Sequence, residues 1–173
     1  MPAQTLARIA GEGLSGAVLM TGSTLPPAII IHSLDQALAA AAAASALNLP
    51  LVLRSAPGAG ATVGVGWFVA LGEALAERYP ALQLTLILDC ADEAGTAMGA
   101  LRRGVRRIRF TGSAEVAAKL AAIAAAQGAA LDEDARPPLD LLGRTDPEAA
   151  CRHWLVEQAR PDHHGVAKPE TLG

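Results

Sequence analysis

Chemically useful side chains gather at two short polar corners, each directly after an apolar run that predicts a β-strand. The corner Asp89-Cys90-Ala91-Asp92 follows Leu84–Leu88, and the corner Thr111-Gly112-Ser113 follows Val105–Phe110. In α/β proteins the chemistry lies at the carboxyl ends of the strands. Asp89 could therefore act as an acid–base group, although a carboxylate in this place could equally cap the next helix or pair with an arginine.

The elements that position these corners alternate between strand and helix, which indicates parallel strands joined by right-handed crossovers. Strands are predicted at Ala28–His32, Leu51–Arg54, Leu84–Leu88 and Val105–Phe110, with a weaker fifth strand from residue 129 to 134. Helices are predicted at Leu34–Leu47 with Ser33 as cap, near Thr62–Tyr79, between Asp92 as cap and Gly104, and at Ala114–Gln127.

Both ends of the chain carry weaker signals. A short helix at Gln4–Gly11 and a brief strand at Ala17–Met20 are expected first. Asp146 and Pro147 predict the start of a last helix that runs to about Arg160, with Cys151, Trp154 and Leu155 in its apolar stripe. We expect one domain over residues 1–160 and a mobile polar tail over residues 161–173.

Composition and charge exclude several classes of protein. The chain has 173 residues, of which 51% are hydrophobic and 18% charged, as in one globular domain. A formal charge of −3 gives no reason to expect nucleic acid as a partner. No apolar run is long enough to span a membrane, and the start of the chain is a poor secretory signal. Two cysteines do not make a disulfide framework, so a cytoplasmic protein with reduced thiols is expected.

Five segments between His32 and Asp134 form a collinear pattern: SLDQALAAAAAASALNLPLVLRSAPGA, ALAERYP, LILDCAD, ALRRGVRRIRFTGS and GAALDED. In this order they resemble the class II, metal-dependent fructose-bisphosphate aldolases. The resemblance implies a (βα)8 barrel, a fold of about 250 residues. The chain is shorter, so we expect an α/β fold of four to five parallel βα units, a half-barrel with an added C-terminal helix.

The resemblance also implies roles for individual residues. Asp89 stands where the family has its proton-transfer aspartate, and Cys90 stands where it has a zinc-binding histidine. Asp134 falls near a glutamate ligand, whereas Thr111 replaces an aspartate associated with a second metal. A catalytic zinc needs about three protein ligands. Since Cys90 and Asp134 offer two, no cofactor is expected, with zinc as the alternative; Cys90 also fits a small buried hydrophobe.

The arginines of the predicted strand Val105–Phe110 could bind an anion. Arg107, Arg109 and Thr111 share one strand face by period-two alternation, and Thr111 matches a residue that faces the barrel interior in the family. A buried arginine needs a partner. Pairing with Asp89, Asp92 or another subunit is one interpretation, and a face open to water is another. A phosphate or similar anion bound by Ser55, Arg107, Arg109 and Ser113 is the functional interpretation.

Two functions remain open at this point. The first is an aldolase-like protein without normal aldolase activity that binds a phosphorylated small molecule or a protein partner. The alternative is a metal-dependent aldehyde-lyase of carbohydrate metabolism that acts on a ketose (bis)phosphate. A half-barrel would also expose strand edges, at Ala28–His32 on one side and at Val105–Phe110 or near Leu131 on the other, so we expect a homodimer. The alternative is a sheet that flattens towards a doubly wound form, with the last helix and the Ala17–Met20 segment covering what remains.

Overall fold

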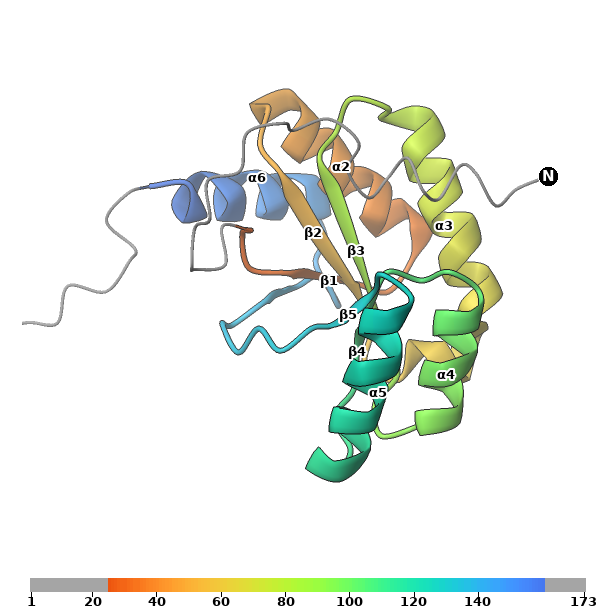
Figure 1. Cartoon of the computed structure of the whole chain (residues 1–173). Coiled ribbons are helices and arrows are strands. Elements are labelled where there is room, and N and C mark those ends of the chain that lie inside the picture. Colours follow the sequence, from red (N-terminus) through yellow and green to blue (C-terminus); the bar gives the residue numbers. More distant parts are fainter. Residues whose placement is uncertain (1–24, 161–173) are drawn as a thin grey trace, which may run out of the picture.

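The structure is a computed structural model, which describes residues 25–160 (Figure 1). The strands are β1 (Ile29–Ile31), β2 (Leu51–Ser55), β3 (Leu84–Asp89), β4 (Arg107–Arg109), β5 (Ala130–Leu131) and β6 (Leu139–Asp140). The helices are α2 (Leu34–Leu47), α3 (Val65–Arg78), α4 (Ala94–Arg102), α5 (Ala114–Ala126) and α6 (Pro147–Gln158), with a π-helical turn, η1 (Gly60–Gly64), before α3. The elements expected at Gln4–Gly11 and Ala17–Met20, and the tail from residue 161, lie outside the described residues.

All six strands are parallel and form one sheet in the order β5-β4-β3-β2-β1-β6. Successive strands from β1 to β5 are added in one direction, and the chain then returns so that β6 pairs with the free side of β1. In a closed (βα)8 barrel the last strand pairs with the first in the same way. The α/β fold of alternating strands and helices, expected from the sequence as a half-barrel, is confirmed.

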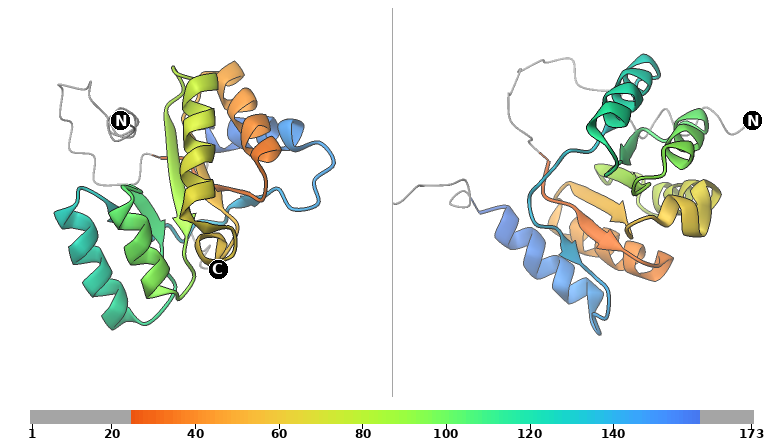
Figure 2. Two further views of the ribbon diagram at one scale, coloured as in Figure 1. Left: turned by 90° about the vertical axis from the view of Figure 1, so that its right-hand side faces the viewer. Right: turned by 90° about the horizontal axis from the view of Figure 1, so that it is seen from below.

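The helices pack against one face of the sheet. Leu51 and Leu53 of β2 belong to the core beneath α2, α3 and α6, whereas Val52 points to the opposite face. The inward face of α2 consists of alanines that are fully buried: Ala37, Ala40, Ala41, Ala43 and Ala44. These small side chains allow α2 to lie close to the sheet and to α6, which runs beside it (Figure 2). None of the helices in residues 25–160 is long and apolar enough to cross a membrane.

Capping side chains explain where most helices begin. The Oγ of Ser33 accepts a hydrogen bond from Gln36 N, and the carboxylate of Asp146 accepts one from Ala149 N with Pro147 next to it, as predicted. The helix α4 forms where it was predicted, but its predicted N-cap is wrong, because Glu93 and not Asp92 takes this position. The residues before this helix form a tight turn, in which Glu93 N donates a hydrogen bond to Cys90 O at 3.0 Å. The helix therefore starts after Glu93.

The strand β6 was not predicted, because it has two residues and follows two prolines. Its register is nevertheless firm, since Leu139 N donates to Ala28 O and Leu141 N donates to Ile30 O, both at 3.1 Å. The expectation that β1 is an exposed edge is therefore wrong. On the other side of the sheet β5 has no further strand among residues 25–160, and a homodimer that covers this edge stays a prediction.

The unit formed by β6 and α6 should contribute measurably to stability. Leu155 of α6 is 2% exposed in the core shared with α2, whereas its neighbour Val156 is 39% exposed. We predict that Leu155→Ala lowers the free energy of unfolding by about 3 kcal/mol. The matched variant Val156→Ala should change it by less than about 0.5 kcal/mol. Chemical denaturation measures both values, and equal changes would show that α6 does not pack as described.

Candidate functional site

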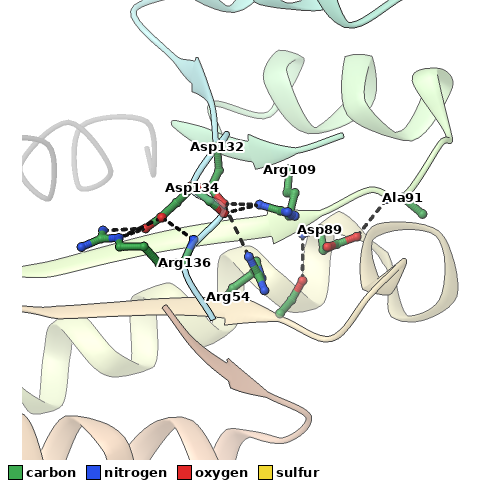
Figure 3. Close-up of polar contacts among 8 residues, drawn as sticks. Arg54, Asp89, Ala91, Arg109, Asp132, Asp134 and Arg136 are labelled. Atoms are coloured by element: carbon green, nitrogen blue, oxygen red, sulfur yellow. Dashed lines mark hydrogen bonds and ion pairs between the residues drawn. The ribbon is translucent and has the colours of Figure 1, made fainter. Parts of the chain in front are cut away.

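Asp89, at the carboxyl end of β3, holds two loops together. Its Oδ1 accepts hydrogen bonds from Gly58 N and Ala91 N, both at 2.9 Å, and its own N–H donates to the Oγ of Ser55 at 2.9 Å. Asp89 is 5% exposed and Ser55 is fully buried. The carboxylate therefore joins the loop after β2 to the turn after β3. Figure 3 shows its contact with Ala91.

Backbone conformation brings the two N–H groups to this carboxylate. Gly58 has φ of +69° and Ala91 has φ of +48°, both in the left-handed region. Glycine adopts this region without cost, but alanine does so against its steric preference. We refer to Asp89 with the N–H groups of Gly58 and Ala91 and the Oγ of Ser55 as the Asp89 clamp. It satisfies a buried carboxylate with backbone donors.

Cys90 points away from the clamp, because successive side chains in a strand alternate between faces. It is fully buried in the helix-facing core with Phe68, Leu88 and Ala97. Burial, and then the charge of Asp89, raises the pKa of the Cys90 thiol to about 12. The burial of this thiol among apolar side chains indicates a packing role for Cys90.

On the face opposite the helices, two arginines converge on one carboxylate. Arg109 Nη1 lies 3.1 Å and Arg54 Nη1 lies 3.7 Å from Oδ2 of Asp132, which is 6% exposed (Figure 3). Desolvation, and then the charge of Arg109, lowers the pKa of Arg54, partly offset by Asp132. The inward arginine predicted at position 109 thus meets Asp132 and not Asp89 or Asp92. Neither Arg54 nor Asp132 was singled out in the sequence.

Asp134 forms a second ion pair beside this cluster. Its Oδ2 lies 2.6 Å from Arg136 Nη2, and Arg136 Nε also donates to both of its carboxylate oxygens. The hydrogen bonds from Arg136 lower the pKa of Asp134 despite partial burial. Arg136 also donates to Leu25 O, and Arg109 donates to Asp134 O. The segment from β5 to β6 is therefore fastened to the sheet by charged contacts.

The remaining anion-site candidates are not brought together. Ser113 caps α5, where its Oγ accepts from Val116 N. Arg107 is half-buried, and no carboxylate of residues 25–160 forms an ion pair with it. Arg107 instead lines a cavity at the amino end of the sheet, away from Ser55 and Ser113.

Sequence reasoning also missed a contact at the carboxyl ends of β1 and β6. His32 Nε2 lies 2.8 Å from Asp140 Oδ1, and Asp140 also accepts from Leu142 N at 2.8 Å. Burial acts to raise the pKa of Asp140, but these hydrogen bonds outweigh it, so the pKa is lowered. A strand as short as β6 gave no signal from which this pair could be expected.

The residues that the family resemblance assigns to a metal do not fit zinc. Cys90 lies on the helix-facing side of the sheet among apolar side chains, and Asp134 lies on the other side in its ion pair with Arg136. Within residues 25–160, no group of three histidine, cysteine or acidic side chains could hold a metal ion. A zinc site needs about three such ligands around one point.

Comparisons with known proteins bear on the family. The chain is 31% identical over 93 residues to fructose-bisphosphate aldolase 2 of Cereibacter sphaeroides, a match that covers 54% of this chain and 26% of that protein. A crystal structure assigned to a fructose-1,6-bisphosphate aldolase of Coccidioides immitis superposes with a TM-score of 0.51 at 22% identity, covering 62% of this chain and 44% of the other. No protein-family model matches. The aldolase resemblance is thus confirmed over part of the chain, which spans less than half the length of these proteins.

The ion cluster on the inner face gives a stability prediction. Asp132→Asn should lower the free energy of unfolding by about 3 kcal/mol, because it removes the ion-pair partner of the buried Arg54. Adding Arg54→Met to this variant should restore part of the loss. Glu133→Gln, at an exposed neighbouring carboxylate, is the control and should have little effect. If denaturation gives the same stability for Asp132→Asn and Glu133→Gln, the cluster does not hold the fold.

The lowered pKa of Asp134 predicts a pH effect. Its carboxyl group titrates below the ordinary value of 3.8 in the folded chain, so the unfolded chain binds the proton more tightly. The stability it contributes is therefore present above pH 3.8 and is lost as pH falls through the folded pKa. We expect Asp134→Asn to be less stable than the wild type at pH 6 and the difference to shrink below about pH 4. A difference that stays constant from pH 6 to pH 2.5 in denaturation experiments would rule out this ion pair.

Proposed function

We propose that this chain is an aldolase-like half-barrel without normal aldolase activity, which binds a small phosphorylated or otherwise anionic molecule. The observation that carries the first half of the proposal is the Asp89 clamp. A general base must reach a proton of the substrate, but the Asp89 carboxylate is 5% exposed and accepts two backbone hydrogen bonds. Its geometry supports a structural role.

The structure gives equally little support for metal-dependent aldol cleavage. In metal-dependent aldol cleavage a bound cation supplies Lewis-acid stabilisation of the developing negative charge. Cys90 and Asp134 face opposite sides of the sheet, and each is already held by other groups. These positions therefore serve packing and ion pairing in this chain.

The second half of the proposal rests on the distribution of arginines. Ser55 and Ser113 are used by the clamp and by a helix cap, and Arg109 is neutralised by Asp132. Arg107 remains available, because no carboxylate of the described residues pairs with it. A guanidinium group is well suited to recognise a carboxylate or a phosphate. A protein partner with an acidic surface is the alternative occupant.

The absence of aldol cleavage can be tested directly. Full-length protein with added zinc should show no cleavage of fructose 1,6-bisphosphate above the background of its Asp89→Asn variant in a coupled assay. Asp89→Asn keeps an oxygen that can accept both backbone hydrogen bonds, so this control should remain folded. Turnover of about 1 s⁻¹ or more that is lost in Asp89→Asn would contradict the proposal and favour the metal-dependent aldehyde-lyase.

A further inference from the structure

A cavity of about 410 Å³ opens at the amino end of the sheet, at the opposite end of β3 from the Asp89 clamp. Its walls come from the first half of β3, the approach to β4, the start of β5 and one face of α3. This volume lies within the range of small-molecule sites, roughly 300 to 1,000 Å³.

The cavity exists because β3 and β4 separate. The two strands pair only at Leu88 with Ile108 and at Asp89 with Arg109, near their carboxyl ends. Residues 84–86 and 105–107 line the cavity and have no partners across the gap in this register. The lining includes glycines at positions 72, 104 and 128, which place no side chain in the cavity.

The cavity is lined by apolar side chains and by two arginines. Most of the wall is apolar, with Phe68, Leu86 and Val105 among its residues, and no acidic side chain of the described chain lines it. Arg106 and Arg107 supply the positive charge. Arg106 is exposed and donates to Gln127 O at 2.9 Å, whereas Arg107 is half-buried without an ion-pair partner among residues 25–160.

We propose that this cavity binds a small molecule that has an apolar body and one anionic head, either a carboxylate or a phosphate, with Arg107 as the anchor of the head. The apolar walls would bury the body, and the guanidinium group would satisfy the charge. The inference rests on the proposed function, since it names the site and the ligand class of the binding role. A phosphorylated sugar fits less well, because its hydroxyl groups would lie against apolar walls without partners.

The volume limits the size of the ligand. A cavity of about 410 Å³ is near the lower end of the range for small-molecule sites, so a short ligand is expected. Octanoate and octyl phosphate are therefore suitable probes, because their alkyl chains are of similar length and they differ mainly in the head group. Fructose 6-phosphate is the polar probe of comparable size.

Titration calorimetry on the full-length chain tests the proposal. We expect octanoate, octyl phosphate or both to bind with one-to-one stoichiometry and fructose 6-phosphate not to bind at the same concentrations. Arg107→Gln should weaken binding by about tenfold or more, and Val69→Trp, which fills the cavity from α3, should abolish it. Arg102→Gln, at an exposed arginine outside the cavity, should leave binding unchanged.

The possible outcomes separate the two proposals. Binding of fructose 6-phosphate, but not of the alkyl probes, in an Arg107-dependent manner would overturn the amphipathic ligand and leave the anion-binding function standing. No binding of any probe would overturn both, as would binding that Arg107→Gln and Val69→Trp leave unchanged. The melting temperature of each variant shows whether it is folded, and Arg107→Gln is informative even if Val69→Trp does not fold.

Discussion

The inner face of this sheet depends on one buried carboxylate, that of Asp132, between Arg54 and Arg109. A guanidinium group buried without a countercharge would be too costly to retain, so the residue after β5 must lie against β2 and β4. This constraint directs the chain from β5 towards β1, where β6 and α6 pair and pack. The positions that a closed barrel would fill with further strands are bypassed by a segment of seven residues, 132–138.

A division of the molecule follows from this arrangement. At the carboxyl end of the sheet, where α/β enzymes carry their chemistry, the polar groups are satisfied by one another: Asp89 by backbone N–H groups, Asp132 and Asp134 by arginines, and Asp140 by His32. At the amino end, the separation of β3 from β4 leaves a cavity with an arginine that the described chain does not neutralise. The carboxyl end of the sheet thus has its polar groups satisfied within the chain, whereas the amino end offers a cavity.

Local signals in the sequence predicted much of the fold. Ser33, and Asp146 with Pro147, place their helices because capping depends on residues within one turn. The contacts of the site could not be predicted in the same way, because they join residues far apart in sequence, such as Arg54 and Asp132. The strand β6 is two residues long, too short for any periodicity. Whether Cys90 and Asp134 meet could not be predicted either, because the two residues are far apart in sequence and only the fold places them on different sides of the sheet.

The central claim is that Asp89 serves the fold and not the chemistry, and hydrogen exchange tests it most directly. The N–H groups of Gly58 and Ala91 lie in loops, where amides ordinarily exchange fast with solvent. If the Asp89 carboxylate holds both, they should be protected to a similar degree as the sheet amides of β3, and Asp89→Ala should remove the protection. Fast exchange of both amides in the wild-type chain would show that the carboxylate is free, and would contradict the account.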